Sequence, residues 1–328
     1  MLLTLTAGAD DDGRRLDRIL RKALRELPLS AIHRFLRQGS VRVNGEVAAA
    51  DRRVQAGQTI TVPQISPLTQ PSVQSSAPGQ NTALSPSLFR VEILFEGAGL
   101  LVLNKPAGLA VHGQESLEGW ALSYLAPKLP ASLSFRPGPL HRLDRPSSGV
   151  IVFSANLQGA RVFSVMMRER RIKKFYLALV RGCIEREEFW QDELSRDRNL
   201  KKTFAAGRGA GGKIAITRIK PLARSFDGEE AGGRSGCTLV LAEIETGRSH
   251  QIRAQAAGRG HPLLYDKKYG GGGSGGFLLH AWRMEFPEDA ALTGFPDFIN
   301  APLPDYFDAK IKKLFGKNVI PLEPEAYT

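Results

Sequence analysis

A loop with one carboxylate among several cations is the first candidate for chemistry in this 328-residue chain. Asp144 lies in the run His141-Arg142-Leu143-Asp144-Arg145, and Pro146 and Gly149 mark this run as a loop before the apolar stretch 150–153. Opposite charges nearby stabilise the ionised form of a carboxylate, and loops carried by rigid strands concentrate catalytic groups. Asp144 could therefore act as a nucleophile or stabilise positive charge. The charge pattern alone favours a simpler role, a salt bridge that braces the loop.

Two patterns that imitate cofactor sites fail on their context. Glycines in the stretch 207–212 have the spacing G-x-G-x-x-G, but they precede a strand-like stretch, 213–219, instead of opening a helix after a strand. Ile214 stands where a phosphate-binding loop needs Ser or Thr. Two cysteines, Cys183 and Cys237, are too few for a structural zinc site. We therefore expect neither a nucleotide cofactor nor a metal.

The elements at the N-terminus predict a small basic α/β unit. Residues 14–62 hold eleven Lys or Arg and four Asp or Glu. Apolar residues at helical spacing predict a helix over 16–24, and Ser30 is expected to cap the start of a second helix. Valines on either side of Asn44-Gly45 predict a hairpin, with a further strand over 59–62. Because the cations flank an apolar stripe, the pattern favours nucleic-acid binding over a merely solvated surface.

The rest of the chain divides into a connection and one large domain. Residues 63–89 carry no charge and include five prolines and six serines, a composition typical of a flexible linker. Residues 90–328 contain several short apolar strands, over 91–95, 100–103, 150–153, 172–180 and 239–245, and a helix over 156–170. We therefore expect domains at 1–62 and 90–328, and an α+β fold in which the large domain has a mixed, largely antiparallel sheet.

The sequences of these segments resemble those of two known families. Residues 13–62, which include Arg15-Leu16-Asp17, resemble the alpha-L RNA-binding domain. The run 141–149 followed by an apolar strand resembles the catalytic motif of the RluA family of pseudouridine synthases. The sequence of residues 37–44 is similar to that of the RluC branch of this family. Three further segments match that family in order and spacing: Leu100–His112, Lys174–Gly182 and Thr246–Arg253. The resemblance implies isomerisation of uridine to pseudouridine without a cofactor.

The resemblance also implies roles for four residues in the reaction. Asp144 would be the essential carboxylate that attacks the sugar or assists a path through a glycal. Tyr176 would stack on the flipped base, while alternation along its strand turns Phe175 and Leu177 towards the core. Arg253, on a short helix capped by Ser249, would pair with the carboxylate, and Arg142 would lie near the gap left by the flipped nucleotide. Without the motifs, Tyr176 would be interpreted as a core residue and Arg253 as a surface cation.

Extracting a base from RNA costs a few kcal/mol, which other contacts with the RNA must offset. The candidates are Arg34 and Arg37 on the second predicted helix, Arg42 on the hairpin, and Lys174. The sequence departs from the family pattern at one place, where Pro146 and Ser147 stand in place of the more usual acidic residue and threonine.

These observations favour an enzyme that isomerises specific uridines in 23S ribosomal RNA. The net charge of +12 agrees with a polyanionic partner. The alternatives are a synthase acting on transfer RNA, or a non-catalytic RNA-binding or ribosome-assembly protein on the same fold. A hydrolytic glycosidase would need a second paired carboxylate, which the sequence does not offer. No signal peptide or membrane-spanning stretch is found, so a cytoplasmic protein, monomeric and not bound to a membrane, is expected.

Overall fold

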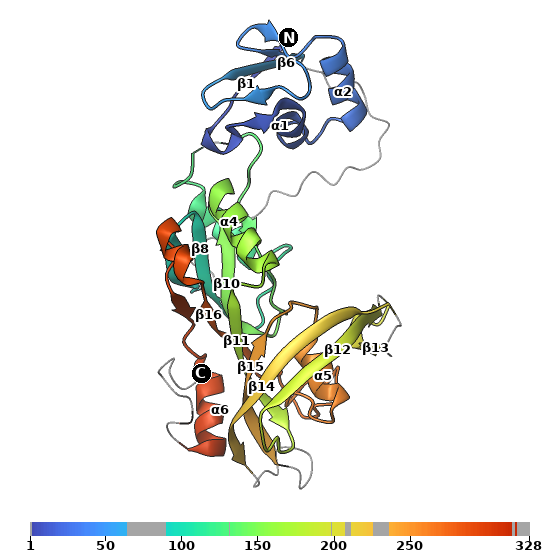
Figure 1. Ribbon diagram of the computed structural model, residues 1–328, viewed down its shortest axis with the longest axis vertical. Helices are drawn as coiled ribbons and strands as arrows, with labels where there is room; N and C mark the ends of the chain where they lie inside the picture. Colours follow the sequence, from blue (N-terminus) through green and yellow to red (C-terminus); the bar gives the residue numbers. More distant parts are fainter. Residues whose placement is uncertain are drawn as a thin grey trace.

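The computed structural model describes residues 2–63, 90–130, 132–197, 199–206, 211–225, 236–316 and 319. Figure 1 shows two units, a small one at the N-terminus and a larger one that contains the rest of the described chain. The segment expected to be a flexible linker lies outside the described residues, apart from Pro63. Among the described residues, no helix has the length and apolar character needed to cross a membrane.

The N-terminal unit contains two helices and a four-stranded sheet of order β1-β6-β3-β4. Leu16, Ile19 and Leu20 are fully buried and lie on one side of the first helix, which confirms the predicted amphipathic stripe. The hairpin is also present, with Asn44 and Gly45 both at positive φ as a two-residue turn requires. The elements are β1 (Leu2–Thr6), η1 (Ala9–Asp11), β2 (Arg14–Arg15), α1 (Leu16–Ala23), α2 (Leu29–Arg37), β3 (Arg42–Val43), β4 (Glu46–Val47), β5 (Arg53–Val54) and β6 (Thr59–Pro63).

The predicted cap of the second helix is wrong. Pro28, not Ser30, occupies the N-cap position, and α2 already begins at Leu29. The carbonyl of Pro28 accepts the backbone N–H of Ala31, so the extended proline starts the helix and leaves Ser30 inside its first turn.

The large unit is built on an eleven-stranded sheet, nine strands of which follow the order β13-β12-β14-β15-β11-β16-β10-β8-β7. Strands β10 and β16 pair in parallel at Ser148 and Gly149, while the other strand pairs of the described residues are antiparallel. This confirms the predicted largely antiparallel sheet. The strands are β7 (Glu92–Gly97), β8 (Leu100–Lys105), β9 (Gly138–Pro139), β10 (Ser148–Ser154), β11 (Lys173–Arg181), β12 (Glu188–Asp197), β13 (Lys202–Ala206), β14 (Lys213–Ser225), β15 (Cys237–Ile244), β16 (Leu279–Glu285) and β17 (Phe298–Asn300).

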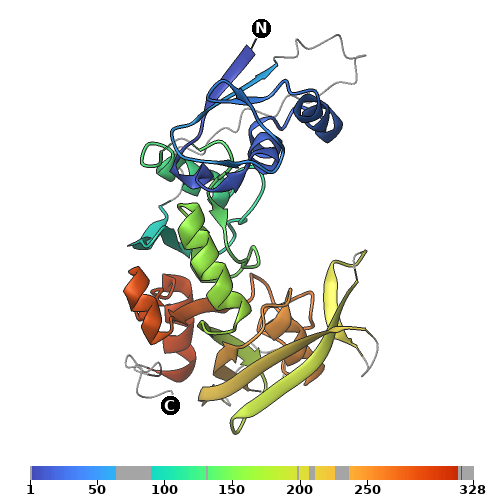
Figure 2. The same cartoon turned by 45° about the horizontal axis from the view of Figure 1, so that its top comes forward.

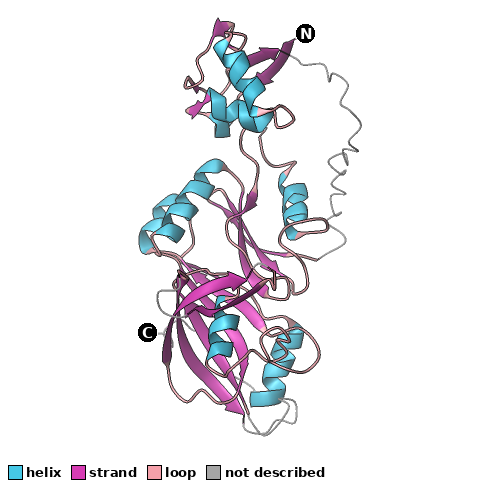
Figure 3. Ribbon diagram, turned by 90° about the vertical axis from the view of Figure 1, so that its right-hand side faces the viewer, coloured by secondary structure: helices cyan, strands magenta, loops and turns pink. Residues whose placement is uncertain are grey.

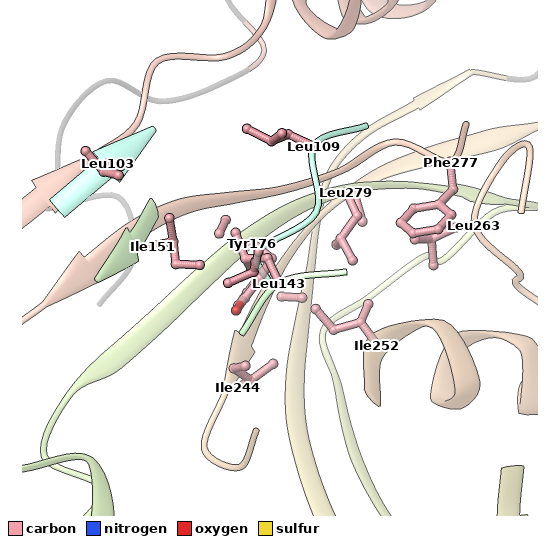
Figure 4. Close-up of a cluster of buried hydrophobic side chains, with 14 of the residues drawn as sticks. Leu103, Leu109, Leu143, Ile151, Tyr176, Ile244, Ile252, Leu263, Phe277 and Leu279 are labelled. Carbon is pink, nitrogen blue, oxygen red and sulfur yellow. The ribbon is translucent and has the colours of Figure 1, made fainter. Parts of the chain in front are cut away.

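Helices cover the sheet on both faces, as the colouring of Figure 3 makes visible. They are α3 (Leu117–Leu125), α4 (Leu157–Arg168), α5 (Gln251–Gly258) and α6 (Asp305–Phe315), with a short η3 (Glu288–Thr293). One face of the central strand β11 places Tyr176 in the apolar cluster of Figure 4. The other face packs Phe175 and Leu177 against Phe307 of α6. Both faces of β11 are therefore core, and Phe175 and Leu177 are buried as predicted, on the face opposite Tyr176.

Candidate active site

The loop that holds Asp144 is fixed at both ends. At its start, the Nε2 atom of His141 accepts the backbone N–H of Val152 at 3.0 Å. Burial lowers the pKa of His141 to about 4, so the imidazole is neutral and can accept this bond at neutral pH. At its end, Gly149 has φ +107°, and a Cβ there would lie 2.1 Å from the carbonyl oxygen of Ala281 on β16. Only glycine fits this close approach of two backbones.

A buried lysine holds the loop through hydrogen bonds to backbone carbonyls. Lys105, at the end of β8, has no exposed surface, and its ammonium donates hydrogen bonds to three backbone carbonyls: Pro106 at 2.9 Å, Leu109 at 2.7 Å and Arg145 at 3.0 Å. Burial lowers the pKa of Lys105 to about 8. The bond to Arg145 fixes the residue next to Asp144. Sequence reasoning gave Lys105 no role, although a lysine that closes the apolar run of β8 was a signal of a partnered ammonium.

Helix α5 brings the predicted arginine to the carboxylate. The Nη1 atom of Arg253 donates to the Oδ2 atom of Asp144 at 2.8 Å, so the expected contact is present. The predicted cap is wrong, because His250 and not Ser249 stands at the N-cap of α5, with a left-handed backbone at φ 56°. This conformation is uncommon outside glycine, and strained residues of this kind cluster at functional sites.

A second carboxylate, missed in the sequence, holds the same arginine. The Nε and Nη2 atoms of Arg253 donate to the two oxygens of Asp266, at 2.7 and 2.9 Å. The guanidinium also lies over the rings of Phe277, at 4.2 Å, and Tyr269, at 4.9 Å. Arg253 is 7% exposed and Asp266 is 1% exposed. Contacts with Asp266, Phe277 and Tyr269 thus fix the guanidinium that binds Asp144.

His250 is a further neighbour of the carboxylate. Its Nε2 atom lies 3.8 Å from the Oδ2 atom of Asp144, and its Nδ1 atom lies 2.9 Å from the hydroxyl of Tyr269. Burial lowers the pKa of His250 to about 4, so the ring is neutral at neutral pH. The sequence analysis did not predict that His250 and Arg253 both meet Asp144.

A cavity of about 60 Å³ lies beside the carboxylate. It is lined by Asp144, His250 and Arg253 together with Arg142, Tyr176, Ile244 and Leu279. The side chain of Asp144 is 15% exposed, so the carboxylate can be reached from solvent. Burial raises the pKa of Tyr176, and its phenol therefore stays protonated at neutral pH. Asp144, Tyr176, Arg253 and Arg142 are brought together here from three segments far apart in the sequence: the loop 141–149, β11 and α5. The cavity thus combines an anionic carboxylate, an aromatic ring and two guanidinium groups.

The cations expected to bind RNA fall into two groups. Arg34, Arg37 and Arg42 are exposed on the N-terminal unit. Lys174 is only 6% exposed, because β11 lies in the middle of the sheet. Lys174 is therefore not among the exposed cations, and its contact with RNA stays a prediction.

The patterns that imitate cofactor sites gain no support. Strand β14 begins at Lys213, as the strand-like pattern predicted, while Gly207 and Gly209 lie outside the described residues. Cys183 is partly buried and Cys237 is buried, and no disulfide bond joins them. Within the described ranges, no three His, Cys, Asp or Glu side chains gather in a way that could hold a metal ion.

Two family models match parts of this chain. The family model described as RNA pseudouridylate synthase matches residues 99–258, and the S4 domain model matches 14–60. The human protein RNA Pseudouridylate Synthase Domain Containing 1 has the same fold, with a TM-score of 0.56 and 22% identity over 72% of this chain and 92% of that one.

Curated relatives identify the family. Ribosomal large subunit pseudouridine synthase C of Pasteurella multocida (strain Pm70) is 34% identical over 95% of this chain and 92% of its own. The protein of the same name from Escherichia coli (strain K12) is 32% identical over 93% and 94%. The chain therefore belongs to the RNA pseudouridylate synthase family, as an RluA-type enzyme with an N-terminal S4 domain. The expectations of fold and enzyme class are confirmed.

Proposed function

We propose that this protein isomerises specific uridines of large-subunit ribosomal RNA to pseudouridine, with Asp144 as the essential carboxylate. The observation that supports the proposal most is the contact of Asp144 with Arg253 in a cavity that also holds Tyr176. The choice of ribosomal RNA rests on the relatives, whose name is ribosomal large subunit pseudouridine synthase C.

The reaction moves one bond and exchanges one proton. The bond between N1 of uracil and C1′ of the ribose breaks, a bond between C5 and C1′ forms, C5 loses its proton to solvent and N1 gains one, so the product is an isomer of uridine. Positive character develops on the sugar as the first bond breaks, and an anionic carboxylate stabilises it. Asp144 either forms an ester at C1′, which breaks when C5 attacks C1′, or takes a proton from C2′ to give a glycal and returns it when C5 bonds to C1′. Both routes need the ionised form of Asp144 at the start and restore it at the end. Arg253 keeps the carboxylate in one orientation without competing for the proton.

The other residues bind the RNA and hold the base. The ring of Tyr176 forms one wall of the cavity on which the extruded uracil stacks. Arg142, at the mouth, fills the gap in the RNA. Arg34, Arg37 and Arg42 of the S4 domain contact phosphates. The chain divides at 1–62, 63–89 and 90–328, and it acts as a monomer in the cytoplasm.

The test is the variant Asp144→Asn. We expect the wild-type protein to release the hydrogen at C5 of uridine from ribosomal RNA, and Asp144→Asn to bind the RNA without turnover. Asp192→Asn is the control, because Asp192 also pairs with an arginine, Arg259, at 2.8 Å but does not line the cavity. Normal turnover by Asp144→Asn would falsify the assignment. Pseudouridine mapping in ribosomal and transfer RNA, with and without the protein, then identifies the substrate, and an unchanged map leaves a non-catalytic RNA-binding protein.

A further inference from the structure

The two domains meet at a contact built around one buried carboxylate. Asp11 of the S4 domain has no exposed surface, and its carboxylate accepts the backbone N–H groups of Leu133 and Ser134, each at 2.9 Å. The hydroxyl of Ser132 donates to it at 3.2 Å, and the hydroxyl of Ser134 also donates to it. All these donors belong to the loop that follows α3 in the large domain. Figure 2 shows this region beneath the S4 domain.

Apolar packing accompanies these bonds. Leu133 packs against the core of the S4 domain, so the loop of the large domain completes that core. The Nη1 atom of Arg14 reaches the carbonyl of Ser134 at 3.5 Å. The contact thus combines burial of an apolar side chain with charge-assisted hydrogen bonds, which are stronger than neutral ones.

A second attachment lies at the start of α4. The Oδ1 atom of Asp10 accepts the backbone N–H of Leu157 at 2.8 Å. This N–H belongs to the first turn of the helix, where backbone donors lack partners within the helix and a negative charge is favoured. Two attachments on different elements of the large domain fix both the position and the rotation of the S4 domain.

We propose that this interdomain contact determines which uridines the enzyme modifies, because it sets the distance and angle between the S4 domain's RNA-binding face and Asp144. Asp11 and Leu133 are then specificity-determining residues that never touch the reacting uridine. An RNA is modified when its S4-binding element and its target uridine match this fixed spacing. The part that concerns RNA rests on the proposed function, but the orientation of the domains does not.

Two variants loosen the contact from opposite sides. Asp11→Asn places an amide N–H₂ where the backbone N–H groups of the loop need an acceptor, and such a buried mismatch is costly. Leu133→Ala combined with Ser134→Ala weakens the contact and leaves the S4 sequence unchanged. Asp12→Asn is the matched control, because it removes the same charge next to Asp11 from an exposed side chain whose carboxylate accepts the backbone N–H of Ala56 in its own domain.

The first measurement is small-angle X-ray scattering of the full chain without RNA. We expect a larger radius of gyration for Asp11→Asn and for Leu133→Ala/Ser134→Ala than for the wild type and Asp12→Asn. Circular dichroism confirms that all variants are folded. Identical scattering from all four proteins overturns the proposal of a fixed orientation, whether or not the protein makes pseudouridine.

The second measurement compares two RNAs. On a short stem-loop that contacts only the large domain, all variants should react at the wild-type rate. On a large-subunit RNA fragment, the two loosened variants should modify the target about tenfold more slowly, because the second binding event loses its favourable effective concentration, and should modify additional uridines. Loosened scattering with unchanged site selection overturns the role in specificity. Absence of pseudouridine with the wild type on both RNAs contradicts the proposed function instead.

Discussion

Replacing Asp266 by asparagine tests whether the position of Arg253 beside Asp144 depends on the ion pair between Arg253 and Asp266. Asp266→Asn keeps the size of the side chain but removes its charge and one of its two acceptors. The bidentate bonds to Arg253, at 2.7 and 2.9 Å, then reduce to one neutral acceptor. The amide N–H₂ faces a guanidinium that offers only donors. Arg253 should therefore shift or tilt away from Asp144.

The expected size of the effect follows from burial. With Asp266 1% exposed and Arg253 7% exposed, water cannot replace the lost partner. Removing one member of a buried ion pair costs roughly 3 kcal/mol of folding stability. A displacement of a positioning group by about 1 Å typically reduces the rate about 10²-fold, which corresponds to about 2.7 kcal/mol in the barrier. The KM for RNA should not change, because a side chain buried behind Arg253 does not touch the RNA.

The assay is tritium release from C5 of labelled uridine in ribosomal RNA, with kcat and KM determined separately, together with urea denaturation. Asp192→Asn is the matched control, since Asp192 binds Arg259, at the end of the same helix α5, at 2.8 Å. It should lose stability and keep its kcat. A kcat of Asp266→Asn equal to that of the control, or a raised KM with normal kcat, would refute the argument that Asp266 acts through Arg253.

Three further outcomes are expected. Lys105→Met leaves three carbonyls without their donor and should lower the free energy of unfolding by about 3 kcal/mol in urea titrations. Burial lowers the pKa of His280 to about 4, so the folded protein binds fewer protons than the unfolded chain between pH 6.5 and 4. Stability should therefore fall as the pH decreases through this window, and His280→Gln should lose less stability than the wild type between pH 7 and 4.5. Arg34→Gln combined with Arg37→Gln should weaken RNA binding, and the slope of log Kd against log salt concentration should fall by about 2, with unchanged kcat. A full salt slope in this double variant would place the RNA elsewhere.

The features that local patterns encode were predictable. The apolar stripe of Leu16, Ile19 and Leu20 and the turn at Asn44-Gly45 depend on neighbours within a few residues, and both are present. The contact between Asp144 and Arg253 joins residues 109 positions apart, and only the family resemblance indicated it.

The contacts and helix caps that sequence analysis missed depend on residues far apart in the chain. In the sequence, Lys105 and Asp266 are single charged residues outside any recognised motif. Only the fold places backbone carbonyls beside Lys105 and Arg253 beside Asp266. The caps expected at Ser30 and Ser249 failed because the direction in which the chain enters a helix is set by tertiary packing, through Pro28 and through the left-handed His250. The acidic residues at 10–12 gave no indication of a contact between domains.

The anchoring of the catalytic loop has a practical consequence for protein design. The segment is attached through His141 to Val152 and through the close approach of Gly149 to Ala281, and neither attachment uses a side chain of 142–147. The exposed positions of this stretch can therefore be exchanged on a constant frame, whereas Leu143 and Ser147 are buried and must be kept. Grafts that also retain His141, Gly149 and Lys105 should fold with altered loop chemistry, whereas a graft that substitutes Gly149 should distort the junction of β10 and β16 even where Asp144 is kept.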